Sequence, residues 1–338
     1  MIEGLKDRKD EVKMRRHIYI LLIIIFAGLE GLAQDPQFTQ FYSNPLYQAP
    51  SFAGGISGYR VSINYRDQWP KMPGKLRTMN IAADMNVQKL NSGIGIIALN
   101  DVAGSASYSN TYVGLLYSYN IRITRRVFLR PGLGVYYNQR SLDYTKLVFA
   151  SQIYANSDVQ PVIPEDFHNV DYFDGSVSML LSLRNTWFGV CADHLLRPNV
   201  SLTSYDYKYP MKFTLFGGTR LYKLERLIST KRQTVTITAS YRHQGSTDQL
   251  DLGLYWSYAP IVLGVWYRDL PLIKDYSRRD ALSILLGYNY KDINIGYSYD
   301  FTISRLVTST GGAHEISMQY RFDIERKHRF KPIPCPEF

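Results

Sequence analysis

Regular alternation of apolar and polar residues is the feature of this sequence that most restricts its fold. The segment Asp292-Ile-Asn-Ile-Gly-Tyr-Ser-Tyr-Asp-Phe301 has an apolar side chain at every second position and a polar or small residue between. Successive side chains of a β-strand point to opposite faces, so this segment predicts a strand with one apolar and one polar face. The same pattern recurs at 234–242, 249–258 and 314–323.

The alternating segments predict about 14 strands, each roughly 9–16 residues long, with no substantial helix between them. The expected strands are 58–67, 76–87, 92–100, 108–122, 126–141, 173–184, 186–195, 212–222, 232–243, 248–258, 260–269, 280–290, 292–303 and 313–324. An even number of long antiparallel strands is typical of a membrane-spanning β-barrel.

The connections between these strands mostly alternate between long and short. Long connections are expected at 68–75, 101–107, 142–172, 196–211, 270–279 and 304–312. This alternation is typical of an up-and-down barrel with long extracellular loops and short periplasmic turns. Two connections fit less well, because 223–231 is long for a turn and 244–247 is short for an outer loop.

A transmembrane barrel also explains why one strand face is so consistently apolar. A bilayer offers no hydrogen-bond partners, so strands can span it only when the sheet closes and leaves no edge. The apolar face then points to lipid and the polar face lines the lumen. Aromatic residues near strand ends are expected to form girdles at the membrane interfaces. These residues are Trp256, Tyr258, Trp266, Tyr267, Tyr288 and Tyr290.

A secreted β-sandwich or β-propeller is the alternative, in which the apolar face packs inside. The expected strands are longer than the roughly 5–6 residues common in globular sheets. A propeller would show repeats of roughly 40–50 residues, and the sequence has none. The fold class that we expect is therefore all-β, a transmembrane up-and-down antiparallel barrel.

Composition narrows the class of protein further. The chain has 338 residues, of which 45% are hydrophobic and 20% charged, so extended disorder is not expected. The mean hydropathy of −0.21 excludes a bundle of membrane-spanning helices. Two Cys exclude a disulfide scaffold and a four-thiolate zinc site. The net charge of +10 would suit a nucleic-acid binder, but the targeting signal at the N-terminus argues against that partner.

The N-terminal residues have the order of a secretory signal. The apolar run 18–27 follows the basic cluster 15–17 and leads to small residues that end at Ala33. The run is too short for a membrane-spanning helix, which needs about 20 apolar residues. We expect cleavage after Ala33, so that 1–33 is leader and signal peptide, and Met14 is a candidate for the true start. The mature chain is then expected outside the cytoplasm.

Several motifs follow one another from the expected cleavage site to the last residue. They are Gln34-Asp-Pro-Gln-Phe-Thr-Gln-Phe41, Asn44-Pro-Leu46, Pro50-Ser-Phe-Ala-Gly54, Asn64-Tyr-Arg-Asp-Gln-Trp-Pro70, Asp280-Ala-Leu-Ser283, Gly296-Tyr-Ser-Tyr-Asp300, His314-Glu-Ile316 and Cys335-Pro-Glu-Phe338. In this order they resemble the PorP/SprF family of type IX secretion membrane proteins. The long connections 142–172 and 196–211 carry no motif of the family.

The resemblance implies an outer-membrane component of the type IX secretion and gliding machinery. Such a protein would bind a specific secreted cargo protein through the cargo's C-terminal domain, and help to export it or anchor it at the cell surface. Its further partners would be other type IX secretion components, and outer-membrane lipid and lipopolysaccharide would surround it. The resemblance implies no enzyme, no cofactor and no nucleic-acid partner. The alternative function is a substrate-selective or passive outer-membrane channel.

The expected organisation beyond the leader has three parts. Residues 34–56 form an N-terminal segment, 57–324 the barrel, and 325–338 a basic tail on the periplasmic side. The N-terminal segment contains three Pro, which limits strand geometry. It is expected either to fold into the lumen as a plug or to remain in the periplasm as a tether, and the sequence does not decide between the two.

Six residues are candidates for contact with protein partners. They are Phe38 and Phe41 in the N-terminal segment, Arg66 and Trp69 at the end of the first strand, and Arg326 and Lys327 in the tail. Trp and Arg dominate the energetics of many interfaces. The structural alternative, which we favour for Arg66 and Trp69, is an Arg paired inside the lumen and a Trp in the aromatic girdle. The tail either docks on an acidic periplasmic partner or ends in solvent.

We expect the extracellular loops to recognise the cargo protein. The polar, irregular connections 142–172 and 196–211 are expected to contact cargo, whereas the N-terminal segment and the tail are expected to face the periplasmic machinery.

No residue pattern predicts catalysis or a bound metal. Asp193-His194 is an acid–base pair, but no nucleophile or oxyanion donor accompanies it, so we expect a rim histidine and not a hydrolase. The six His lack metal-ligand spacing. Cys191 and Cys335 are expected to be independent thiols, although the compartment would permit a disulfide.

Overall fold

The computed structural model describes residues 35–72, 74, 76–147, 168–203, 205–224, 233–268, 281–303 and 310–322. The leader, its cleavage site after Ala33 and most of the 142–172 loop lie outside these residues. The tail lies outside them as well, and with it Arg326, Lys327 and Cys335.

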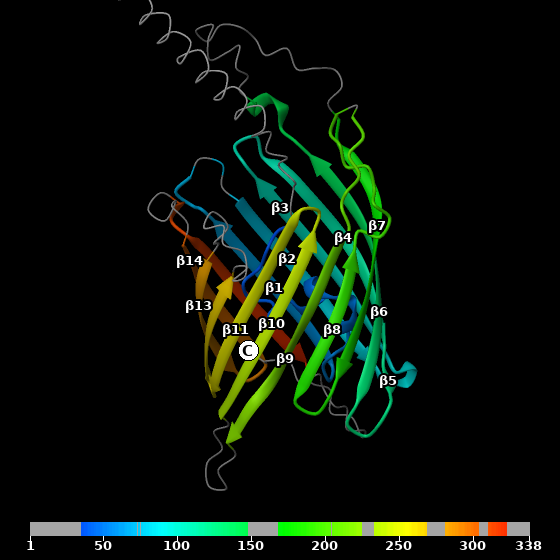
Figure 1. The fold of residues 1–338 in the computed structure, drawn as a ribbon, viewed down its shortest axis with the longest axis vertical. Helices are drawn as coiled ribbons and strands as arrows, with labels where there is room; N and C mark the ends of the chain where they lie inside the picture. Colours follow the sequence, from blue (N-terminus) through cyan, green and yellow to red (C-terminus); the bar gives the residue numbers. More distant parts are fainter. Residues whose placement is uncertain are drawn as a thin grey trace, which may run out of the picture. The chain divides into compact units, whose positions relative to one another are not determined.

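Fourteen strands form a closed antiparallel barrel (Figure 1). They are β1 (Tyr59–Gln68), β2 (Leu76–Val87), β3 (Ser92–Ala103), β4 (Tyr108–Tyr119), β6 (Phe128–Ser141), β7 (Val170–Ser182), β8 (Thr186–Asp193), β9 (Lys212–Leu224), β10 (Gln233–Gln244), β11 (Thr247–Tyr258), β12 (Ile261–Arg268), β13 (Ala281–Tyr290), β14 (Ile293–Thr302) and β15 (Ala313–Phe322). The short β5 (Ile121–Arg122) pairs with β6 inside the connection that follows β4. Each barrel strand pairs with its sequence neighbours, and β1 pairs with β15 to close the sheet.

This architecture confirms the fold class expected from the alternation. Every expected strand is present close to its expected bounds. β2 covers 76–87 as expected, whereas β7 begins at Val170, ahead of the expected 173. Among the described residues, no helix has the length and apolar character needed to cross a membrane.

The strand connections fall at two ends of the barrel, which we call the loop end and the turn end. The loop end, at the top of Figure 1, carries 69–75, 104–107, 142–169, 194–211, 245–246, 269–280 and 303–312. The turn end carries 88–91, 120–127, 183–185, 225–232, 259–260 and 291–292. Because long loops of such barrels lie outside the cell, the loop end is the extracellular one.

Burial along the strands is the reverse of burial in a water-soluble protein. In β14, Ile295 is 48% exposed and Tyr297 and Phe301 are also exposed, whereas Ser298 and Asp300 on the other face are buried. Apolar side chains normally lie inside a folded protein and charged ones outside. The reversal means that the apolar face meets lipid, which excludes the sandwich and propeller alternatives.

Part of the expected aromatic girdle lies on this outer face. Trp256, Tyr288 and Tyr290 are exposed near the turn ends of their strands, and the Trp256 ring stacks on Tyr258 with 5.9 Å between ring centroids. The expectation for Trp266 is wrong, because its side chain is only 3% exposed and belongs to the buried face of β12. Trp266 therefore packs in the lumen and does not contact lipid.

The chain before β1 contains two short helical turns, α2 (Pro45–Gln48) and the 3-10 helix η1 (Pro50–Phe52). A Pro begins each of them, where its missing N–H costs no intrahelical hydrogen bond. The 3-10 helices η2 (Gln88–Leu90) and η3 (Tyr144–Lys146) lie in connections. Residues 38–46 and 49–56 are buried, and the partners that bury them are inward-facing side chains of the barrel.

Candidate functional site

Residues 36–56, which we call the plug, run through the lumen from the loop end to the turn end. Near the loop end, Thr39 accepts a hydrogen bond from Arg268, the last residue of β12. Near the turn end, Ala53 accepts one from Ser118, the last residue but one of β4. Ser51 lies between these levels and donates its backbone N–H to Ser178 in β7. The plug thus leads down the lumen before the chain turns back up as β1.

Three buried barrel residues near the loop end hold the upper part of the plug. We call Arg66, Asp300 and Glu315 the loop-end clamp. The Glu315 carboxylate accepts the backbone N–H of Thr39 at 2.7 Å and that of Gln40 at 3.0 Å. The Thr39 hydroxyl donates to Asp300 at 2.8 Å. Arg66 lies between the carboxylates, with Nη2 2.7 Å from Asp300 Oδ2 and Nη1 3.2 Å from Glu315 Oε2. Charge-assisted hydrogen bonds of this kind are the strongest ones that proteins form.

Further ion pairs extend the loop-end clamp along the lumen wall. Arg268 Nη1 lies 3.8 Å from Asp300, and its Nε lies 3.1 Å from Asp251. Arg242 Nη2 lies 2.6 Å from the other oxygen of Asp251. Together with Arg66 and Glu315, three arginines face three carboxylates. This balance matters because an unpaired charge buried away from water is costly.

The upper part of the plug spans the seam where the first and last strands meet. Arg66 in β1 and Glu315 in β15 are register partners across this seam. One turn further along the plug, Gln319 of β15 donates to the backbone carbonyl of Ser43 at 2.7 Å. Asn64 of β1 donates to the Ser43 hydroxyl at 2.6 Å. The plug therefore connects both strands of the seam.

A second group of residues, the turn-end clamp, holds the lower part of the plug. Asp84 accepts the backbone N–H of Gly54 at 2.8 Å and pairs with Arg60 at 2.8 Å. Arg130 Nη2 donates to the Ala53 carbonyl at 2.5 Å. The two clamps share one principle, since charged side chains bind backbone groups of the plug that no secondary structure satisfies.

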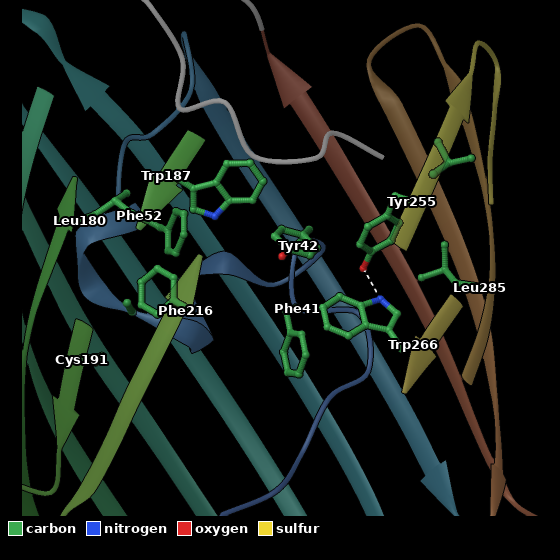
Figure 2. Packing of buried hydrophobic residues seen from close by; sticks show 12 residues of the cluster. Phe41, Tyr42, Phe52, Leu180, Trp187, Cys191, Phe216, Tyr255, Trp266 and Leu285 are labelled. Carbon is green, nitrogen blue, oxygen red and sulfur yellow. Dashed lines mark hydrogen bonds between the residues drawn. The ribbon is translucent and has the colours of Figure 1, made fainter. Parts of the chain in front are cut away.

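An aromatic wall formed by residues of β7 to β9 and β11 to β13 packs against the plug (Figure 2). The Phe41 ring meets Trp266 edge to face at 5.1 Å, and Trp266 Nε1 donates to the Tyr255 hydroxyl at 2.6 Å. Phe52 lies against Phe216 with 5.3 Å between centroids. The wall consists of Leu180, Trp187, Cys191, Phe216, Tyr255, Val262, Trp266 and Leu285.

Two strand glycines leave room for the plug backbone. A Cβ atom on Gly93 would lie 1.9 Å from the Ala53 carbonyl oxygen, and one on Gly132 would lie 2.3 Å from Ser51 N. Neither distance is compatible with a side chain. The glycines at 93 and 132 are therefore strand residues whose lack of a side chain lets the plug backbone approach.

Some buried polar atoms around the plug have no hydrogen-bond partner in the described part of the chain, including Arg66 Nε and Arg130 Nε in the two clamps. Asn44, Asn64 and Asn80 are buried, and each carries at least one side-chain atom without a hydrogen-bond partner in the described part of the chain. A buried polar atom without a partner costs free energy.

The structure brings three of the predicted contact residues into this site. Arg66 belongs to the loop-end clamp, Phe41 packs on Trp266, and the buried Phe38 ring meets Tyr47 edge to face at 5.0 Å. Trp69 lies apart from them at the loop end, partly exposed, and its backbone N–H donates to the Gly312 carbonyl at 2.8 Å. Whether these residues also bind a partner protein stays a prediction.

The acid–base pair Asp193-His194 does not form one unit. His194 Nδ1 lies 2.5 Å from Asp174, whereas Asp193 pairs with Lys212 at 3.2 Å and accepts a weak hydrogen bond from Cys191. Within the described residues, no group of three or more His, Cys, Asp or Glu could hold a metal ion.

One outer loop is organised as a small hairpin. Asn199 bridges to Lys208, and the Val200 N–H donates to the Tyr207 carbonyl at 2.9 Å. Asn199 Nδ2 also donates to Asp206 at 2.7 Å. Tyr205 at the tip is 83% exposed. An aromatic side chain is thus presented to solvent on an ordered loop.

The beginning of the long 142–172 loop is also ordered. Asp143 accepts the Thr145 N–H at the start of η3 and lies 2.8 Å from the Lys146 ammonium. The hydrogen bonds from Lys146 and Thr145 hold the pKa of Asp143 below its usual value. The root of this loop therefore keeps a charged pair at the extracellular mouth.

Sequence reasoning missed the aromatic wall. Leu180, Tyr255 and Leu285 each stand between two other apolar residues, at positions where strict alternation would place a polar side chain. Such breaks are the signal that could have located the wall, because an apolar residue on the lumenal face needs an apolar partner inside the barrel.

A protein-family model matches most of this chain. A family model described as type IX secretion system membrane protein PorP/SprF matches residues 31–320. Comparison with curated proteins gives no match. Among solved structures, the toluene transporter TbuX of Ralstonia pickettii is 10% identical with a TM-score of 0.47, over 82% of this chain and 93% of its own. The toluene transporter TodX of P. putida is 12% identical with a TM-score of 0.45, over 81% of this chain and 92% of its own.

Proposed function

Because this chain belongs to the PorP/SprF family of type IX secretion system membrane proteins, we propose that it binds a secreted cargo protein at its loop end. It is an outer-membrane barrel with a role in type IX secretion. In the proposed function it helps to export one cargo protein or to anchor it at the cell surface, by recognising the C-terminal domain of that cargo.

The observation that carries this proposal is the filled lumen. The plug is held at both ends by buried charges and packs against an aromatic wall. A segment of the chain itself therefore occupies the lumen. A barrel filled in this way is suited to present surfaces to other proteins. For the same reason it is a poor candidate for a passive, permanently open channel.

The surface that best suits cargo recognition is the hairpin 199–208. Its tip carries the exposed Tyr205, and aromatic side chains supply much of the binding energy at protein interfaces. The connection 142–172 and the partly exposed Trp69 lie at the same end and are further proposed contacts. Arg66 and Phe41 support this surface indirectly, because they hold the plug below it.

The remaining partners are on the periplasmic side and around the barrel. We propose that the basic tail, with Arg326 and Lys327, docks on an acidic surface of another type IX secretion component. Outer-membrane lipid and lipopolysaccharide would contact the exposed apolar strand faces. Neither proposal includes a cofactor or a chemical reaction.

Truncation of the hairpin tip tests the cargo proposal. Tyr205→Ala should release one surface protein into the medium, since loss of a hot-spot aromatic side chain costs about 2–4 kcal/mol of binding free energy. Tyr205→Phe should retain it. Quantitative proteomics of the cell surface and the medium measures the change.

Leu90→Ala is the matched control, because Leu90 is an exposed apolar residue at the turn end. All variants should keep the heat-modifiable mobility of a folded barrel. If Tyr205→Ala and replacement of the whole hairpin by two glycines both leave every surface protein in place, this loop is not the cargo site.

A further inference from the structure

The direction of the plug differs from the expectation that the N-terminal segment faces the periplasmic machinery. The Thr39 end is tied to Arg268 and Asp300 near the loop end, and the Gly54 end is tied to Asp84 and Asn86 toward the turn end. The net direction from Thr39 to Gly54 is therefore away from the extracellular side.

Pro36 and Phe38 lie at the same end of the lumen as Thr39. The Tyr47 hydroxyl donates to the Pro36 carbonyl, and the Phe38 ring packs on Tyr47. The level of Tyr47 is fixed independently by Lys212, the first residue of β9, whose ammonium lies 5.7 Å from the Tyr47 ring centroid. All of these groups therefore lie at the extracellular mouth.

We propose that Pro36–Phe38 form a surface-accessible end of the plug, which the cargo protein held by the outer loops engages. This proposal rests on the proposed cargo-binding function for the identity of the partner, but not for the exposure of the segment. It replaces the expectation that the N-terminal segment faces the periplasmic machinery. Pro36 and Gln37 are the accessible residues here, because they are partly exposed whereas Phe38, Thr39 and Gln40 are buried.

Engagement at this position has a mechanical consequence that loop contact alone lacks. Thr39 and Gln40 follow Phe38 directly, and their backbone N–H groups are bound by Glu315 in the last strand. A partner that holds Pro36–Phe38 therefore acts on the loop-end clamp through two peptide bonds. The bound cargo is thus connected to the seam between β1 and β15 through Thr39, Gln40 and Glu315.

Thiol labelling in living cells tests the exposure. The background carries Cys191→Ser and Cys335→Ser, and single cysteines replace Gln37, Ser105 at the loop end or Asn91 at the turn end, where the latter two are exposed. A membrane-impermeant maleimide should label Gln37→Cys and Ser105→Cys in intact cells. It should label Asn91→Cys only after the outer membrane is permeabilised. Labelling of Gln37→Cys only after permeabilisation, or only after denaturation, would overturn the proposed exposure.

Comparison of exporting and export-deficient cells tests the partner. Cells whose type IX export is inactivated display no cargo, so labelling of Gln37→Cys should be several-fold faster there than in exporting cells, relative to Ser105→Cys. An equal rate in both would overturn engagement by cargo and leave the exposure standing. Loss of cargo retention in Tyr205→Ala is measured separately, so failure of the proposed function is distinguishable from failure of this inference.

Discussion

At the scale of single residues, the loop-end clamp shows how a polar lumen can hold a chain segment. Arg66 is the shared partner of Asp300 and Glu315, and both carboxylates also bind groups of Thr39. Removing the arginine would leave two buried negative charges with fewer partners. The loop-end clamp therefore depends on the single side chain of Arg66.

We expect Arg66→Met to destabilise the folded barrel by about 3–5 kcal/mol, the cost of breaking a buried ion pair from one side. Arg77→Met is the control, because Arg77 is half exposed and its distance to Asp67 is 3.8 Å. Exposed pairs contribute about 0–1 kcal/mol. Urea titration of both variants in detergent, followed by tryptophan fluorescence, measures the difference. Equal midpoints for the two variants would contradict the role given to Arg66.

The type of each residue also decides whether its orientation in the barrel can be predicted from the sequence. The alternation in β14 was sufficient to place Ile295 outward and Asp300 inward, because period and polarity agree there. It failed for Trp266, whose aromatic character suits both a lipid interface and a lumenal wall. The partner that decides between the two, Phe41, lies far away in the sequence, and local pattern carries no information about it.

At the scale of elements, the plug and the strands are fitted to each other. η1 approaches β6 at Gly132, where no side chain intervenes. Sequence analysis left the plug and the tether as alternatives because residues 34–56 have no regular period. The contacts that position the segment, such as Thr39 with Glu315, are set by closure of the whole sheet.

Gly132→Ala should displace η1 from the wall, because the added methyl group meets the backbone of Ser51. Overpacking of this kind costs about 1–3 kcal/mol. Gly175→Ala is the matched control in the neighbouring strand, where the nearest atom to an added Cβ lies 3.7 Å away. The thermal midpoint of heat-modifiable gel mobility should fall for Gly132→Ala alone. A fall of the same size in Gly175→Ala would show that the plug is not what Gly132 accommodates.

At the scale of the whole molecule, a barrel of 14 strands has an interior wider than its own lumenal side chains can fill. Eight strands enclose just enough room for side chains, whereas barrels of about 16–18 strands leave an aqueous channel. This barrel lies between the two, and its own N-terminal segment occupies the interior. Strand count and membrane placement were predictable from period and composition, but the filling of the lumen was not.

The purified protein should therefore show little steady conductance in planar lipid bilayers. Deletion of residues 36–52 should open an aqueous path and raise the conductance strongly, because the clamps and the wall then face an unoccupied lumen. Where the deletion does not fold, Gly132→Ala should still produce more frequent open events than Gly175→Ala. Steady conductance of the intact protein at the level of the deletion variant would favour the channel alternative.

The tie between Thr39 and Glu315 joins positions 276 residues apart, which restricts the order in which the molecule can be completed. The early segment is synthesised long before β15, and Thr39 can bind Glu315 only when that strand docks on β1. Until then both the unpaired sheet edge and the aromatic residues of the segment stay open to wrong partners. A chain terminated just before β15 would lack both the β1–β15 pairing and the Glu315 contact that holds Thr39. Correct assembly of the barrel and its plug therefore requires the strand β15.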